Sequence, residues 1–125
     1  MIPADLNIEN INKTYQNLTK YVQQTPFIKG WSLIDEILDT NAYFKLEFLQ
    51  NSGTFKARGA TNNILNLSNK TLKKGITAVS AGNHAIAASY VANLFRLKNK
   101  IFIYKSANPY KIKKCQELKA NLYFT

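Results

Sequence analysis

The chain has little of the chemistry that disulfide frameworks and metal sites require. Its 125 residues include one cysteine, Cys115, and one histidine, His84. One cysteine cannot form an intramolecular disulfide, and one thiol with one imidazole falls short of the three or four ligands of a typical zinc site. We therefore expect neither a disulfide framework nor a structural metal.

Long apolar runs are also missing. No uninterrupted apolar segment approaches the roughly 20 residues that a transmembrane helix needs, and no basic and then apolar leader opens the chain. The 46% hydrophobic and 19% charged content is that of an ordinary globular domain. The sequence therefore predicts a cytoplasmic protein that makes no use of a membrane.

Acidic residues are few, seven against 17 lysines and arginines, which gives a formal net charge of +10. Such an excess attracts polyanions, including nucleic acids. Lysine greatly outnumbers arginine, however, whereas base recognition and bidentate phosphate contacts favour arginine. Lysine, asparagine and isoleucine are abundant together, as a chain-wide compositional bias would produce, so we disfavour nucleic acid as a partner.

Predicted helices and strands alternate along the chain. Apolar residues at helical spacing predict helices over residues 6–22, 54–67, 82–95 and 108–118. Strand-like apolar runs lie at 27–28, 42–49, 75–80, 101–104 and 121–124. The order strand, helix, strand, helix, strand from residue 75 onward is that of βαβ units. We therefore predict an α/β fold with a parallel sheet that is covered by helices on both faces.

Lys56 is the first candidate for chemistry, because it falls in the first turn of a predicted helix. The positive end of the helix dipole and the nearby charge of Arg58 both disfavour an ammonium there. A neutral amine is what Schiff-base chemistry requires. A solvated surface lysine in a lysine-rich chain is the alternative.

The second candidate is the loop formed by Ser80, Ala81, Gly82, Asn83 and His84, where a predicted strand turns into a helix. The free amides of a helix start, which Gly82 makes approachable, can bind a carboxylate or a phosphate. Such loops at the carboxyl ends of strands are where open α/β sheets bind ligands. An amine and an anion loop in one crevice would suit a carbonyl cofactor that handles an amino acid.

Other prominent residues receive structural interpretations. Lys111, Lys113 and Lys114 fall within one predicted helix, and a charge run of this kind is typical of a solvated face. We expect Cys115 to be buried, because no second thiol or base partners it. We likewise expect Trp31 to lie in the core.

Two segments carry a resemblance to a known family. Asn51-Ser52-Gly53-Thr54-Phe55-Lys56-Ala57-Arg58-Gly59-Ala60 resembles the cofactor-lysine segment of the pyridoxal-phosphate-dependent threonine/serine dehydratases and serine racemases, and Ser80-Ala81-Gly82-Asn83-His84-Ala85 resembles their substrate-carboxylate loop. The likeness covers nearly the whole chain. It implies an incomplete fold type II unit, similar to the tryptophan synthase β subunit, with residues 1–70 opening a large domain and residues 71–125 forming a truncated small domain.

The resemblance also implies roles for these residues. Lys56 would hold pyridoxal 5′-phosphate covalently and move the substrate's α-proton, Phe55 would pack beside the cofactor ring, and Asn83 would bind its 3′-oxygen. The loop from Ser80 to His84 would hold the substrate carboxylate. The implied reaction removes the β-hydroxyl group of L-threonine or L-serine and releases a 2-oxoacid and ammonia.

Departures from the family pattern limit what we expect of this chain. The five glycines are scattered, so they cannot form the family's glycine-rich phosphate loop, and Lys119 stands where a glycine usually follows a helix. We therefore expect an amino-terminal fragment that is inactive alone and is completed by a homo-oligomer or a carboxyl-terminal half. Ala81 replaces the second serine of the racemases and favours dehydration. A racemase-like fragment and a non-catalytic basic fragment that binds partners or nucleic acid are the alternatives.

Overall fold

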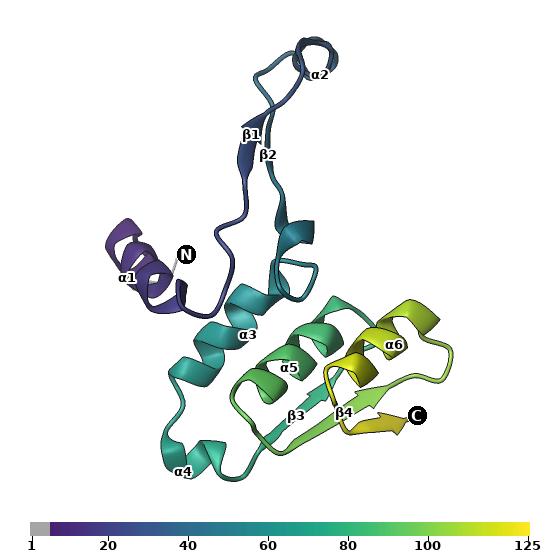
Figure 1. Cartoon of the computed structure of the whole chain (residues 1–125). Helices are drawn as coiled ribbons and strands as arrows, with labels where there is room; N and C mark the ends of the chain where they lie inside the picture. Colours follow the sequence, from purple (N-terminus) through teal and green to yellow (C-terminus); the bar gives the residue numbers. More distant parts are fainter. Residues whose placement is uncertain (1–5) are drawn as a thin grey trace.

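An extended arm and a helix-covered sheet make up the chain, which this computed structural model describes from residue 6 to residue 125 (Figure 1). The elements are, in order, α1 (Ile8–Leu18), β1 (Phe27–Lys29), α2 (Ser32–Leu38), β2 (Tyr43–Lys45), the 3-10 turn η1 (Glu47–Leu49), α3 (Lys56–Leu65), α4 (Asn69–Leu72), β3 (Ile76–Val79), α5 (Asn83–Leu94), β4 (Asn99–Ile103), α6 (Pro109–Glu117) and β5 (Leu122–Phe124). None of the helices described has the length and apolar content needed to cross a bilayer.

A three-stranded parallel sheet in the order β3-β4-β5 confirms the predicted α/β class. Its core is built from alternate residues of the strands, among them Ile101 and Ile103, which are almost completely buried. Cys115 packs into the same core from α6, as expected. Asn108 caps α6 by accepting a hydrogen bond from the Tyr110 amide at 2.9 Å.

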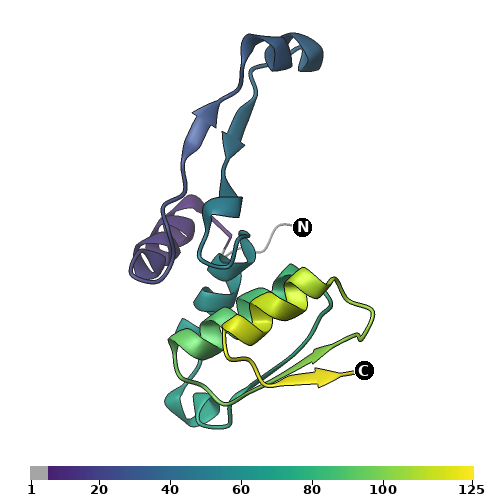
Figure 2. The same cartoon turned by 45° about the vertical axis from the view of Figure 1, so that its right-hand side comes forward.

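Helices α5 and α6 cover the same face of this sheet (Figure 2). The strand order runs in one direction, and right-handed crossovers then place successive helices on one side. The predicted coverage of both faces is therefore met on one face only within residues 6–125. On the other face Val79 is 71% exposed, and the rings of Phe102 and Tyr123 stack on each other with centroids 5.1 Å apart.

The arm consists of β1 and β2, paired antiparallel, with α2 at the far end (Figure 1). The predicted strand over 42–49 was wrong beyond Lys45, because the chain turns into η1 there. Trp31 does not lie in a core as expected but is 75% exposed. Many large apolar side chains of the arm share this exposure: Phe27, Ile28, Leu33, Ile37, Leu38, Tyr43 and Phe44.

Helix α3 lies between α1 and α5 and fixes the position of the lysine-bearing segment. Leu18, Val22 and Ala57 form a small second core at its contact with α1. The Tyr90 hydroxyl of α5 donates a hydrogen bond to the backbone oxygen of Tyr21, which ties this core to the sheet layer. The residue 70–71 boundary predicted between two domains falls inside α4, and this division stays a prediction.

Candidate functional site

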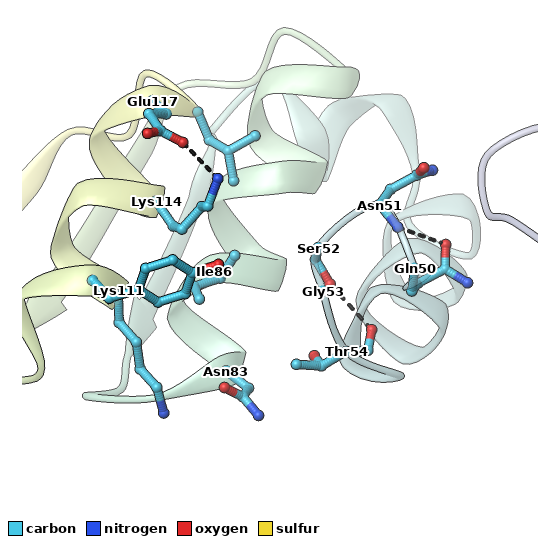
Figure 3. A pocket seen from close by; sticks show the side chains of 12 residues that line it. Gln50, Asn51, Ser52, Gly53, Thr54, Asn83, Ile86, Lys111, Lys114 and Glu117 are labelled. Atoms are coloured by element: carbon cyan, nitrogen blue, oxygen red, sulfur yellow. Dashed lines mark hydrogen bonds and ion pairs between the residues drawn. The ribbon is translucent and has the colours of Figure 1, made fainter. Parts of the chain in front are cut away.

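A cavity of about 390 Å³ opens between the turn that precedes α3, the start of α5 and one side of α6 (Figure 3). The turn contributes residues 50–54, and α5 contributes Asn83 and Ile86. Helix α6 contributes four side chains with polar ends: Tyr110, Lys111, Lys114 and Glu117. The two segments that the sequence singled out therefore meet at one cavity, although they lie on different helices.

The turn before α3 is held firmly in place. Gly53 has a φ of +70°, a conformation that favours glycine, and its amide donates to the Gln50 carbonyl at 2.6 Å. The buried Gln50 side chain accepts from the Gln23 amide at 2.8 Å and donates to the Gln23 carbonyl at 3.0 Å. These paired bonds fasten the cavity wall to the segment that leads into the arm.

Lys56 begins α3 immediately after this wall, and its amide donates to Thr54 Oγ1 at 3.3 Å. Its side chain is exposed, with Nζ 4.8 Å from the centroid of the Phe55 ring. Phe55 is 57% exposed. Neither residue lines the cavity, whose wall ends at Thr54. The structure thus places an accessible amine and an accessible ring beside the cavity.

Arg58 does not add charge at Lys56 in the way the sequence suggested. Its guanidinium binds the Glu47 carboxylate through two hydrogen bonds, Nε to Oε2 at 2.9 Å and Nη2 to Oε1 at 2.8 Å. This ion pair offsets the like charge that was expected to act on the lysine. The same bonds lower the pKa of Glu47, against the opposing effect of its partial burial.

The loop before α5 has one donor already engaged. Gly82 is the N-cap residue of α5, and its amide donates to Ser80 Oγ at 3.1 Å. The amides of Asn83 and His84 in the first helical turn have no acceptor among the described residues. Ala81 packs partly buried against the core. The backbone donors available for an anion are therefore the amides of Asn83 and His84 at the helix start and that of Ala81 before it.

The side chains of Asn83 and His84 point to different places. Asn83 lines the cavity described above, whereas His84 lines a separate cavity of about 270 Å³ between α3, β3 and α5. Of His84, only the backbone amide at the start of α5 can take part in binding an anion there. The predicted carboxylate loop is therefore divided, with its imidazole outside the main cavity.

Lys111 and Lys114 line the cavity, although their charge run predicted a solvated face. Their spacing of three residues puts both on one side of α6, and Lys114 Nζ pairs with Glu117 Oε2 at 2.9 Å. One feature could have indicated that these lysines face the site: α6 starts beyond the carboxyl end of β4, next to the start of α5. Helical spacing alone could not show which side of α6 faces the site.

The donor set fits part of pyridoxal phosphate. An exposed primary amine suits its carbonyl carbon, the neighbouring Phe55 ring suits its aromatic ring, and the Asn83 amide side chain suits a ring oxygen. No two of the five glycines are adjacent, so this chain presents no glycine cradle for the phosphate. The residues at hand match the ring end of the cofactor, and the phosphate end needs further residues.

Comparisons with known proteins agree with this geometry. The family described as pyridoxal-phosphate dependent enzyme matches residues 18–125. Phenylserine dehydratase of Ralstonia pickettii is 38% identical over 105 residues, covering 84% of this chain and 32% of the relative. L-threonine ammonia-lyase of Thermotoga maritima is 34% identical over 117 residues, covering 94% of this chain and 29% of the relative. The structure of maize serine racemase superposes with a TM-score of 0.87 at 29% identity, covering 95% of this chain and 36% of the racemase chain. The chain spans about a third of the length of the curated relatives it matches.

Proposed function

This chain belongs to the pyridoxal-phosphate-dependent enzymes of fold type II, and we propose that it is the amino-terminal part of an ammonia-lyase acting on L-threonine or L-serine. The observation that carries the proposal is the meeting of the Ser52–Thr54 turn and Asn83 at one cavity, with Lys56 directly after the turn. The similarity to an L-threonine ammonia-lyase and a phenylserine dehydratase supports the choice of reaction.

In the proposed site Lys56 Nζ would hold the cofactor covalently and would move the proton of the substrate's α-carbon. Phe55 would lie against the cofactor ring, and Asn83 would donate a hydrogen bond to its 3′-oxygen. The free amides at the start of α5 orient the substrate carboxylate. When bound, pyridoxal phosphate would supply an electron sink for the α-carbon after loss of its proton, and the hydroxyl group would leave from the neighbouring β-carbon.

The substrate side of the site favours elimination over racemisation in our proposal. A residue that moves a proton on the opposite face of the substrate needs an ionisable or hydroxyl group, and Ala81 has neither. The similarity to serine racemases is nevertheless substantial, so a racemase-like activity is the second candidate. Chiral analysis of serine incubated with wild-type protein and with Ala81→Ser would separate the two.

We also propose that further polypeptide completes the site. The missing phosphate cradle and the many exposed apolar side chains of the arm both support a carboxyl-terminal half or a second subunit. Residues 1–70 would then open the large domain, and residues 71–125 would belong to the small domain. The cytoplasmic location stays a prediction.

Cofactor capture by Lys56 tests the proposed function directly. The 125-residue chain is incubated with pyridoxal phosphate and reduced with borohydride, and the modified peptide is mapped by mass spectrometry. We expect the label on Lys56, its loss in Lys56→Ala and no change in Lys70→Ala, which alters an exposed lysine of α4. Labelling spread evenly over the lysines, or unchanged in Lys56→Ala, would reject the proposal.

Catalysis is measured separately, because we expect the chain alone to be catalytically inactive. Release of 2-oxoacid from L-threonine and from L-serine is followed with and without a polypeptide that contains a glycine-rich loop and is encoded beside this chain. Activity that requires both polypeptides supports a divided enzyme. Captured cofactor without activity in any combination supports a non-catalytic relic, and polyanion binding that falls steeply with salt supports the basic interaction protein.

A further inference from the structure

Lys111 lies at the end of the cavity next to Gly82, in the loop before α5. Gly82 has no side chain, and the position that a Cβ atom would take there is 3.8 Å from Lys111 Nζ and 3.9 Å from Ser80 Oγ. Figure 3 shows the side chain of Lys111 running beside that of Asn83, with the polar ends of both on the same side of the cavity. The ammonium therefore faces the segment whose backbone amides are free.

No carboxylate neutralises Lys111 within residues 6–125. Its neighbour Lys114, one turn later, pairs with Glu117, whereas Lys111 makes no ion pair among the described residues. The sequence contains no aspartate or glutamate between Glu47 and Glu117. A half-buried lysine at a cavity, with no counter-ion among residues 6–125, is suited to bind an anion from outside the chain.

The loop before α5 needs such a charge. Because the Gly82 amide is engaged by Ser80 Oγ, the loop offers the amides of Asn83 and His84 at the helix start and that of Ala81 before it. Neutral amide donors bind a carboxylate weakly in contact with water, whereas a charge-assisted hydrogen bond is about twice as strong as a neutral one. Lys111 supplies the missing positive charge at the correct end of the cavity.

We propose that Lys111 binds the α-carboxylate of the amino-acid substrate, together with the free amides of Asn83 and His84. This assignment rests on the proposed function, because it gives Lys111 a ligand at the same site. It makes Lys111 a residue that determines selection for amino acids with a free α-carboxylate. Esters and amides of the same amino acids lack the charge that Lys111 recognises.

The test is a titration of the 125-residue chain with L-serine, followed by the backbone amide resonances of Asn83 and His84. We expect Lys111→Gln to weaken L-serine binding about ten- to a hundredfold, and Lys111→Arg to retain most of it. The matched control is Lys113→Gln, which removes an exposed charge of the same helix outside the cavity and should leave the affinity unchanged. L-serine methyl ester should bind wild type and Lys111→Gln equally weakly.

A second arm uses inorganic phosphate, because the phosphate of the cofactor is another anion that Lys111 could hold. A loss of phosphate affinity in Lys111→Gln without a loss of L-serine affinity would overturn the proposal, as would equal L-serine affinity in wild type and Lys111→Gln. Borohydride labelling of Lys56 is measured on the same variants. Labelling without a Lys111 effect rejects this inference alone, whereas a Lys111 effect without labelling rejects the cofactor role of Lys56 alone.

Discussion

Arg58 of α3 binds the carboxylate of Glu47 in η1 through two parallel hydrogen bonds, and both side chains are largely shielded from water, at 24% and 17% exposure. The Thr25 hydroxyl also donates to this carboxylate. Three segments separate in sequence thus meet at one ion pair: the entry to the arm, its exit and the helix that begins with Lys56. The pair therefore connects the arm mechanically to the candidate site.

Replacing this carboxylate should destabilise the protein. Glu47→Gln keeps the size of the side chain but removes the charge that Arg58 and Thr25 bind, and we expect a loss of about 1–3 kcal/mol in the free energy of unfolding. Urea denaturation measures it. Glu36→Gln in α2 changes an exposed carboxylate that makes no ion pair among the described residues and serves as the control. Equal losses in both variants would contradict a specific role for Glu47.

The same pair predicts how stability depends on pH. The pKa of Glu47 is lowered in the folded state, chiefly by its hydrogen bonds to Arg58, from an ordinary value of 4.5. A lowered folded pKa contributes stability above the unfolded pKa, and this contribution is lost as the pH falls through the folded pKa. We expect the urea midpoint to fall below about pH 4.5 more steeply in wild type than in Glu47→Gln. Identical acid limbs would contradict this account.

Gly75 should not tolerate a side chain. Its φ is +85°, and a Cβ atom there would lie 2.5 Å from the backbone oxygen of Lys98. We expect Gly75→Ala to destabilise the fold by about 2 kcal/mol or more, because left-handed strain and a backbone clash act together. Gly59→Ala is the matched control, since nothing lies within 4 Å of its Cβ position inside α3, and it should gain about 0.5–1 kcal/mol.

Replacing Lys119 by glycine should stabilise the protein. Lys119 stands where a glycine usually follows a helix, and its φ of +57° is a left-handed conformation that is unfavourable for lysine. We expect Lys119→Gly to raise the free energy of unfolding by about 1 kcal/mol. Lys113→Gly, inside the same helix, should lower it by a similar amount. A destabilised Lys119→Gly would show that its side chain makes contributions beyond its backbone.

Cys115 should react only when the fold opens. Its side chain is fully buried in the core, and burial raises the pKa of the thiol. Only the thiolate reacts rapidly with disulfide reagents, so both effects slow the reaction in the native state. We expect labelling by a disulfide reagent to be slow in buffer and to rise in parallel with urea unfolding measured by circular dichroism. Rapid labelling of folded protein would contradict the position of Cys115.

Local signals made the helix starts near the site predictable. Gly82 before α5 and Asn108-Pro109 before α6 are short-range features, and each helix begins there. The direction of the α6 side chains was not predictable, because it depends on which strand α6 follows and where α5 begins. Lys111 was therefore assigned to solvent, although it faces the cavity. The end of β2 at Lys45 was not predictable for a similar reason, since the turn that follows it includes Glu47, whose partner Arg58 is distant in sequence.

The arm shares little buried surface with the rest of the molecule. Its two strands are three residues each, its apolar side chains are exposed, and its attachment depends on the Glu47–Arg58 pair and the bonds between Gln50 and Gln23. Backbone amide hydrogens of Ile28 and Phe44 should therefore exchange with deuterium long before those of Ile101 and Ile103. A local opening of the arm would also release the turn that precedes Lys56. The segment around the Lys56 amine would then lose its fixed position while strand β4 stays folded.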